Sequence, residues 1–283
     1  NFSGSSYVVF GQAAGFSAAL NLSSLDGNNG FRLDGAATYD RSGISVSDAG
    51  DVNGDGFADV IVGAAGPNGN YSGSSYVVFG KASSFDATID LSILDGSNGF
   101  RLDGVAELDQ LGTSVSSAGD VNGDGFGDVI VGAKGADPNG LSSGSSYVVF
   151  GKAAGFNAAL NLSSLDGNNG FRLDGVAADD ASGGSVSNAG DVNGDGFDDV
   201  IVNAPHAALN NHYSSSSYVI FGKASGFDAT MNLSSLDGKN GFRLDVAWNR
   251  SVNSAAGDVN GDGFDDVIIG VPPSGLNGRS SGS

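Results

Sequence analysis

The chain alternates short apolar runs with polar, glycine-rich segments along its whole length. Between residues 111 and 175 the apolar runs fall at 113–116, 128–132, 145–150 and 170–173. They are rich in Val, Ile, Tyr and Phe and are bounded by Gly, Asn and Asp, which is typical of β-strands. No sustained helical periodicity is present, although residues 156–165 are compatible with one short helical turn. The pattern predicts four antiparallel strands in this stretch.

The same pattern recurs in four units, at approximately 5–73, 74–144, 145–215 and 216–283, which we expect to form a single domain, 1–283. The segment Gly-Phe-Arg-Leu-Asp marks each unit, beginning at Gly30, Gly99, Gly170 and Gly241. Such self-similarity indicates a solenoid, a propeller or an array, in which each unit buries its apolar face by stacking on its neighbours. Four short antiparallel strands per unit favour the blades of a β-propeller.

The two ends of the chain lie at the same phase of the repeat. Residues 1–6 align with 141–146, and residues 279–283 align with 141–145. Two strands of one blade would then come from each end of the chain. The sequence therefore predicts an all-β fold, a β-propeller of four four-stranded antiparallel blades. Its ring would be closed by the N- and C-terminal strands, which removes open sheet edges. A four-blade piece of a larger propeller is the alternative.

A polar nine-residue segment, Asp-Val-Asn-Gly-Asp-Gly-Phe-x-Asp, occurs once in each unit. Positions 1, 3, 5 and 9 carry side-chain oxygens, and the Phe at position 7 can offer its backbone carbonyl. Hard cations such as calcium bind about six to eight oxygens, whereas zinc and copper favour the His or Cys that the loop lacks. The candidate calcium ligands are Asp51, Asn53, Asp55, Phe57 and Asp59; Asp120, Asn122, Asp124, Phe126 and Asp128; Asp191, Asn193, Asp195, Phe197 and Asp199; and Asp258, Asn260, Asp262, Phe264 and Asp266.

The loop begins like an EF-hand but does not end like one. Position 12, where an EF-hand has a bidentate Glu, is apolar in every unit, at Val62, Val131, Val202 and Ile269. The flanking residues resemble strands rather than helices. We therefore expect a β-hairpin loop that binds calcium, with about four ions per chain. A metal-free Asn-Gly or Asp-Gly hairpin turn is the alternative.

These motifs resemble the FG-GAP repeats of integrin α-subunit propellers, which also occur in glycosylphosphatidylinositol-specific phospholipase D and in large bacterial surface proteins. The matching residues are the Phe-Gly pairs at Phe79, Phe150 and Phe221, the four acidic loops, and Val-Gly-Ala-Ala-Gly-Pro at 62–67. The resemblance covers all four units and implies a calcium-loaded propeller. The chain departs from the family in two features. The family builds seven blades, whereas this chain has four units, and the family often fills only some of its loops, whereas all four units here carry the loop.

Charge and composition narrow the possible partners and compartment. The formal net charge is −20, from 32 acidic and 12 basic residues. This excess disfavours nucleic acid, which binds basic surfaces. No stretch is long and apolar enough to insert into a membrane. There is no Cys, and four calcium loops suit an extracellular or cell-surface protein. The chain opens at Asn1, so we expect a processed chain or a fragment, either a monomer or part of a larger chain.

The units differ mainly in the loops expected opposite the calcium loops. These loops are 64–72, 133–143 and 204–215 within units, and 36–42, 105–112, 176–183 and 246–250 between them. They hold His206, His212, Trp248, Tyr39, Tyr71 and Tyr213. Variable loops on a rigid scaffold often bind ligands, although unconstrained drift would give the same variation. Trp248 and Arg250 would form a pocket rim or pack over the ring closure, and Arg32, Arg101, Arg172 and Arg243 would pair with carboxylates.

No combination of residues indicates a catalytic site. The chain has no Cys, no G-x-S-x-G elbow and no H-E-x-x-H motif, and its carboxylates recur in quartets. This favours a calcium-binding extracellular propeller over an enzyme. It would serve as an adhesion or recognition module for an unknown protein or carbohydrate ligand, such as a glycan or surface polymer. A secreted hydrolase or lyase acting on a polymer, and an architectural module of a large surface protein, are the alternatives.

Overall fold

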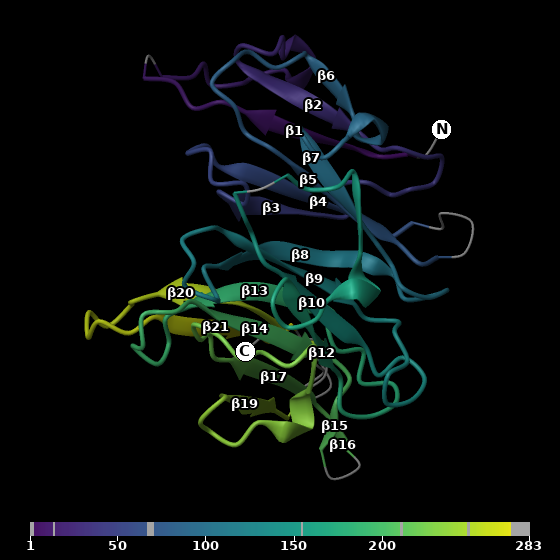
Figure 1. Cartoon of the computed structure of the whole chain (residues 1–283), viewed down its shortest axis with the longest axis vertical. Helices are drawn as coiled ribbons and strands as arrows, with labels where there is room; N and C mark the ends of the chain where they lie inside the picture. The colour runs from purple at the N-terminus through teal and green to yellow at the C-terminus, as the bar shows by residue number, and fades with distance from the viewer. Residues whose placement is uncertain are drawn as a thin grey trace.

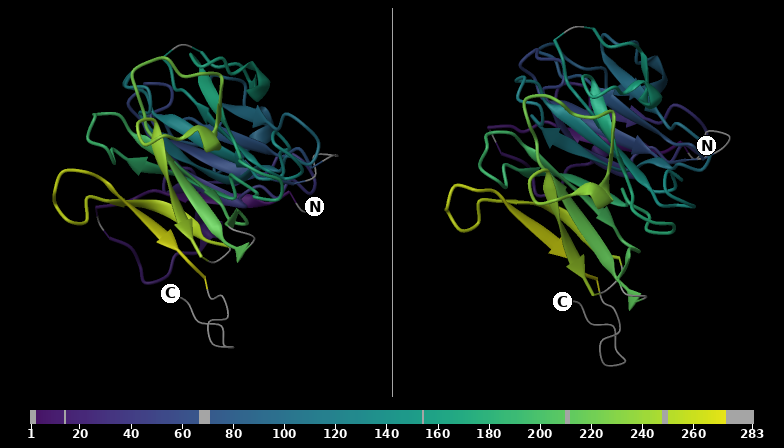
Figure 2. Two further views of the ribbon diagram at one scale, coloured as in Figure 1. Left: turned by 90° about the horizontal axis from the view of Figure 1, so that it is seen from below. Right: turned by 60° about the horizontal axis from the view of Figure 1, so that its bottom comes forward.

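A computed structural model describes residues 3–13, 15–66, 71–153, 155–209, 212–247 and 250–272. The described chain is built of short β-strands joined by turns, which confirms the all-β prediction. The sheets formed by residues 5–246 follow one another down the long axis of the molecule in chain order, and the last two strands lie beside the sheet that precedes them (Figure 1 and Figure 2). Within these residues no helix has the length and apolar character needed to cross a membrane.

Three complete blades can be traced in the described residues, each an antiparallel sheet of four strands in chain order. Blade I contains β3 (Ser45–Gly50), β4 (Asp59–Ala64), β5 (Ser74–Val78) and β7 (Gly99–Asp103). Blade II contains β8 (Leu111–Gly119), β9 (Asp128–Ala133), β10 (Ser145–Val149) and β12 (Gly170–Asp174). Blade III contains β13 (Ser185–Gly190), β14 (Asp199–Ala204), β17 (Ser215–Ile220) and β19 (Gly241–Val246). The strands predicted in the second unit are thus confirmed.

Two half-blades flank these sheets. The N-terminal half-blade pairs β1 (Ser5–Val9) with β2 (Gly30–Asp34), which correspond to the third and fourth strands of a blade. The C-terminal hairpin pairs β20 (Val252–Gly257) with β21 (Asp266–Gly270), which correspond to the first and second strands. Among the described strands the two half-blades do not pair with each other. The predicted four-bladed ring, closed by the two ends of the chain, is therefore not confirmed.

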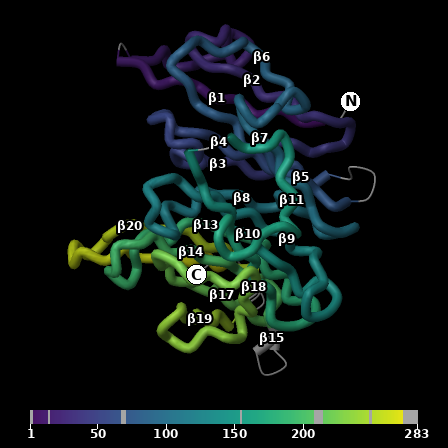
Figure 3. Tube along the Cα trace, in the orientation of Figure 1, coloured from purple at the N-terminus to yellow at the C-terminus, as the bar shows by residue number. Residues whose placement is uncertain are grey.

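A short strand from each following unit extends the outer edge of a sheet. The strands β6 (Thr88–Asp90), β11 (Ala159–Asn161) and β18 (Thr230–Asn232) run parallel to β2, β7 and β12 respectively. Figure 3 shows the connection that carries β11 reaching from blade II to β7. One 3₁₀ turn follows in each unit, at η1 (Leu22–Ser24), η2 (Leu91–Ile93), η3 (Leu162–Ser164) and η4 (Leu233–Ser235). The short helical turn predicted within 156–165 is confirmed as η3.

Neighbouring sheets are held together by apolar side chains. Phe156 leaves the connection before β11 and stacks on Phe100 of blade I, with ring centroids 4.4 Å apart. The same stack joins Phe85 to Phe31 at 4.4 Å and Phe227 to Phe171 at 4.6 Å. Because the same contact recurs at each step, successive sheets are related by nearly the same displacement.

The fourth unit has one additional residue before its acidic loop. Each first strand carries a register shift at this point, in β20 between Ala255 and Gly257 and in β3 between Asp48 and Gly50. A bulge of this kind is therefore common to the units and does not absorb the additional residue. The additional residue instead shifts the sequence along β20, so that Asn253 takes the position that Val46 has in β3. A small hairpin, β15 (Ala208–Leu209) with β16 (His212–Tyr213), also distinguishes blade III.

Candidate metal centre

Each acidic segment forms the loop between the first and second strands of a sheet. In the first loop the backbone N–H of Asp55 donates to Asp51 Oδ1 at 3.0 Å and to Asn53 Oδ1 at 2.9 Å. Gly56 N–H donates to Asp51 Oδ2, and Phe57 N–H donates to Asp55 Oδ1, both at 2.9 Å. The side chains at positions 1, 3 and 5 therefore turn inward over one curl of backbone. The other three loops repeat this arrangement.

The Asp at position 9 lies deeper than the other acids of its loop. Asp59 is buried, and its two carboxylate oxygens accept the N–H groups of Val52 and Gly80 at 2.9 and 2.8 Å. Burial raises the pKa of Asp59 to about 6, that of Asp199 to about 7 and that of Asp128 to about 8. A buried carboxyl with a raised pKa holds a charge that its surroundings only partly compensate, and a nearby cation would stabilise that charge.

The donor set fits a hard cation. Each loop presents carboxylate, amide and backbone oxygens without nitrogen or sulfur ligands, which suits calcium better than a transition metal. The backbone N–H of Gly263 lowers the pKa of Asp258, which favours the ionised form that a cation requires. In the described residues, however, no group of three or more His, Cys, Asp or Glu side chains is arranged to hold a metal ion. Only two of the three inward-facing side chains of a loop are carboxylates, because position 3 is Asn. The Asp at position 9 accepts backbone N–H groups instead, as Asp59 does. The proposed ligands, including the position-7 carbonyls, remain predictions.

Two acids that the motif left undefined connect successive loops. Asp198 and Asp265 stand at position 8, and they accept the backbone N–H of Asp120 at 2.7 Å and of Asp191 at 2.9 Å from the preceding loop. The first two units have Ala58 and Gly127 at this position, so a four-fold motif could not reveal the contact. The sequence pointed to this contact only by placing an acid at position 8 in the last two units.

The Phe at position 7 also connects neighbouring loops. The ring of Phe126 covers Gly54, that of Phe197 covers Gly123 and that of Phe264 covers Gly194. A Cβ at any of these glycines would lie 2.3 Å from a ring carbon. The loops thus form a continuous row along one face of the molecule, in which each loop rests on the next.

The loops that connect the strands lie on two opposite faces of the molecule, as the sequence predicts. Lys152 N–H, just after β10, donates to Val52 O in an acidic loop, which places the connection between third and fourth strands on the metal-loop face. On the opposite face, Gly66 N–H donates to Asp40 O and Gln110 N–H donates to Tyr71 O. We call this the variable face, made of the loops between second and third strands and between successive sheets.

On the variable face the backbone conformation is the same in successive connections, while the side chains differ. Tyr39, Leu108 and Asp179 occupy the same position in successive connections and all have positive φ, at 69°, 68° and 66°. Their side chains are exposed. The side chains of His212 and Tyr213, and Trp248 as a whole, lie outside the described residues, so the proposed pocket rim is untested there. Arg250 N–H donates to Pro205 O.

The recurring arginines pair as predicted. Arg32, Arg101, Arg172 and Arg243 form ion pairs of 2.7–2.9 Å with Asp34, Asp103, Asp174 and Asp245, two residues further along the same strand. The pairs are partly exposed, so each adds little to stability. Because these ion pairs recur in every unit, we assign them to the scaffold.

The sequence of each unit matches a known repeat. The model of the FG-GAP repeat matches residues 45–78, 111–149, 182–220 and 252–283, which together make up half of the chain. The chain belongs to the FG-GAP repeat family. The matched segments cover the first three strands of blades I to III and the C-terminal hairpin, so each includes one acidic loop. The suspected resemblance to FG-GAP repeats is therefore confirmed.

Two kinds of curated protein contain similar FG-GAP sequence. Phosphatidylinositol-glycan-specific phospholipase D of Bos taurus is 33% identical over 175 residues, which are 61% of this chain and 20% of the bovine protein. The Homo sapiens protein of the same name is 31% identical over 176 residues. Integrin alpha-2 of Mus musculus is 37% identical over 95 residues, 34% of this chain and 8% of the integrin. The chain thus spans a fifth or less of these relatives.

Proposed function

We propose that this FG-GAP chain is an extracellular, calcium-stabilised module of the propeller type that recognises a protein or carbohydrate ligand through its variable face. The observation that carries the proposal is the contrast between the two faces. In every acidic loop the position-5 N–H donates to the position-3 Asn, whereas Tyr39, Leu108 and Asp179 present different side chains from the same backbone position. A constant scaffold with variable loops is a common arrangement for binding proteins.

Calcium would be held by the oxygens at positions 1, 3, 5 and 9 and by the position-7 carbonyl, with one ion in each loop. The bound ion would neutralise the carboxylates of its loop. The chain's own residues already supply the curl of backbone and the contacts between loops. Calcium binding would therefore stabilise the fold by mass action, because the unfolded chain does not assemble the ligands.

The calcium proposal is tested by metal content and by a matched pair of variants. Asp120→Asn keeps the hydrogen-bond acceptor but removes one ligand charge, and we expect one site to bind calcium about tenfold more weakly, since ligand charge sets affinity. Asp179→Asn makes the same charge change on the variable face and should leave all sites intact. The measurements are elemental analysis and calcium titration calorimetry. Equal calcium binding by the two variants would exclude the second loop as a site.

Chelation gives an independent test of the structural role of calcium. The melting temperature of the chain should fall markedly in EDTA and recover when calcium is restored. Limited proteolysis should then cut at the strands that follow the acidic loops. An unchanged melting curve on demonstrably metal-free protein would show that the loops are ordinary hairpin turns.

Ligand recognition is tested on a glycan and surface-polymer array with variants of each face. Tyr39→Ser and Leu108→Ser remove exposed apolar side chains from the variable face, and we expect about a tenfold loss of affinity if these are contact residues. Ile93→Ser removes a similarly exposed side chain from η2 and serves as the control. Equal losses in all three variants would contradict recognition by the variable face. The phospholipase activity named for the bovine relative belongs to a protein of which this chain spans a fifth.

A further inference from the structure

The third acidic loop, in blade III, ends with two neighbouring carboxylates that serve two different loops. Asp199 at position 9 is buried, and its two carboxylate oxygens accept backbone N–H groups of its own blade. Asp198 directly precedes Asp199 and the strand β14, in which successive side chains point to opposite sides. The Asp198 side chain therefore leaves its own loop and meets the second loop, in blade II, where its Oδ2 accepts the N–H of Asp120 at 2.7 Å.

This contact fixes the first ligand position of the second loop. The carboxylate of Asp120 is used inside the loop, where Oδ1 accepts Asp124 N–H at 3.0 Å and Oδ2 accepts Gly125 N–H at 2.9 Å. The backbone of Asp120 is held from outside, because Asp198 accepts its N–H and donates an N–H to its carbonyl oxygen at 3.3 Å. One residue of blade III thus pairs with both backbone polar groups of Asp120.

The carboxylate of Asp198 lies against Gly119, the residue before the second loop. A Cβ at Gly119 would lie 2.2 Å from Asp198 Oδ2, and its φ of +78° favours glycine. The Asp198 side chain is half-buried, and within the described residues it forms no ion pair with Lys or Arg. Its negative charge is therefore not compensated by a cationic side chain and adds to the negative potential of the second loop.

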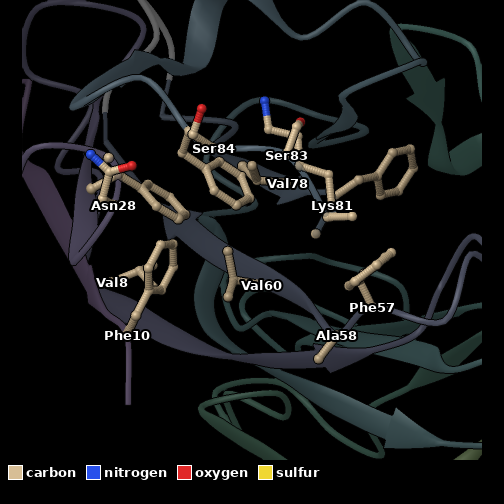
Figure 4. A pocket seen from close by; sticks show the side chains of 16 residues that line it. Val8, Phe10, Asn28, Phe57, Ala58, Val60, Val78, Lys81, Ser83 and Ser84 are labelled. Atoms are coloured by element: carbon tan, nitrogen blue, oxygen red, sulfur yellow. The ribbon is translucent and has the colours of Figure 1, made fainter. Parts of the chain in front are cut away.

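The first loop shows the same backbone contact without the acid. The N–H of Asp55 donates to Asp51 Oδ1 at 3.0 Å, the distance found at the same place in the second loop. Gly127, at position 8 of the second loop, donates its N–H to Asp51 O at 2.9 Å but has no side chain to accept the N–H of Asp51. The first loop itself carries Ala58 at position 8, shown in Figure 4. The junction of the first two loops therefore lacks only the carboxylate.

The other contacts between loops are common to both junctions. Lys223 N–H, from blade III, donates to Val121 O at 2.9 Å, and Val121 N–H donates to Asp128 Oδ2 at 2.9 Å. At the preceding junction Lys152 N–H donates to Val52 O, also at 2.9 Å, and Val52 N–H reaches the position-9 Asp at the same distance. Asp198 is therefore the feature that distinguishes the second loop from the first at these contacts.

We propose that Asp198 raises the calcium affinity of the second loop from the neighbouring blade, as a positioning residue that holds Asp120 and supplies charge. This role requires the calcium site proposed above for the second loop. Groups that orient metal ligands typically change metal affinity about 10- to 100-fold, and the charge near a site sets calcium affinity. By linkage, calcium in the second loop strengthens the contact between Asp198 and Asp120 by the same factor. The ion in blade II would thus also hold blade III.

Two substitutions separate the charge of Asp198 from its hydrogen bond. Asp198→Asn can still accept the N–H of Asp120 but carries no charge, whereas Asp198→Ala removes both. Calcium titration of the whole chain, followed by NMR of the backbone amides, reports each loop separately, because the position-6 Gly N–H donates to the position-1 Asp of its own loop. We expect the calcium affinity of the second loop to fall about tenfold in Asp198→Asn and at least as much in Asp198→Ala. The affinity of the first loop should be unchanged.

Asp90→Asn is the charge-matched control. Asp90 Oδ1 accepts Ser92 N–H at 2.8 Å, and Asn161 makes the same contact with Ser163 N–H at 3.0 Å in the next unit, so the amide fits this position. This variant should leave the calcium affinity of every loop unchanged. An unchanged second loop in Asp198→Asn, or a loss confined to Asp198→Ala, would overturn the role of the charge. Equal losses in the first and second loops would also overturn it, because they would indicate a general effect on the fold.

Failure of the calcium site itself gives a different result. If the amide of Gly125 in the unmodified chain did not respond to calcium, the second loop would not be a site, and both proposals would fall there. If Gly125 responded with the same calcium dependence in the unmodified chain and in Asp198→Asn, the site would stand and only the role of Asp198 would be excluded. The amide spectrum of Asp198→Asn outside the second and third loops should match that of the unmodified chain, which checks that the variant is folded.

Discussion

Asp40, Asp109 and Asp180 occupy the same position in successive connections of the variable face, and each is buried. Each accepts a backbone N–H three residues earlier, as Asp109 does from Ala106 at 2.7 Å. Burial raises the pKa of all three carboxyls above the ordinary value of 3.8. These acids therefore shape the turns that carry the variable side chains, and their ionisation destabilises the fold.

Asp109→Asn should flatten the pH dependence of stability. A carboxyl whose pKa is raised by folding contributes stability that is complete below its unfolded pKa and is lost as pH rises through its folded pKa. The amide can still accept the Ala106 N–H but does not ionise. We expect the free energy of unfolding, measured by urea titration in constant calcium, to fall less than in the unmodified chain as the pH rises above the ordinary carboxyl pKa of 3.8.

Glu107→Gln is the matched control for this variant. Glu107 lies in the same connection with an exposed side chain, so its substitution makes the same change in formal charge without removing a buried acid. Its pH dependence should follow that of the unmodified chain. If Asp109→Asn also followed that curve, the buried carboxyl would not be a determinant of stability.

The sequence could predict the positions of the loop acids because their spacing is local and repeats in every unit. Asp51, Asn53 and Asp55 turn inward over a single curl of backbone, as their spacing suggested. It could not predict the contacts of Asp198 and Asp265, which depend on how closely one loop approaches the next. Such distances are fixed by the packing between sheets, which no single motif contains.

At the scale of elements, the antiparallel strands were predictable but the short parallel strands were not. Residues 159–161 and 19–21 have the same sequence, Ala-Leu-Asn, yet only 159–161 form a strand, which is β11. The difference comes from β7, which offers a partner edge to β11. These strands therefore form because neighbouring sheets are present, and the local pattern alone carries no signal for them.

The stacked Phe pairs should account for much of the stability between sheets. Phe156→Ala removes a buried ring that stacks on Phe100, and we expect the free energy of unfolding to fall by about 3–5 kcal/mol. Phe16→Ala makes the same change at the equivalent exposed position and should cost a single chain no more than about 0.5 kcal/mol. Chemical denaturation of dilute protein would measure both. Similar losses in the two variants would show that the stack between sheets contributes little.

At the scale of the whole molecule, the sequence predicted the four repeat units but not how many blades complete a ring. The alignment of the ends fixes only the phase of the repeat. The number of blades in a ring depends on the rotation between successive sheets, which is set by contacts such as the Phe stacks and the rings over Gly54, Gly123 and Gly194. A four-bladed ring was therefore a reasonable expectation that the spacing of the sheets does not confirm.

Two glycines at the same loop position test how much the contact between neighbouring loops contributes to stability. Gly123 and Gly261 hold the same loop position with φ of +71° and +76°, so alanine adds similar backbone strain, about 1–2 kcal/mol, at either site. A Cβ at Gly123 would lie 2.3 Å from the Phe197 ring, whereas nothing lies within 4 Å at Gly261. We therefore expect Gly123→Ala to lower the free energy of unfolding, measured by chemical denaturation, well beyond Gly261→Ala. Equal losses in the two variants would show that the contact of the Phe197 ring with the neighbouring loop contributes little to stability.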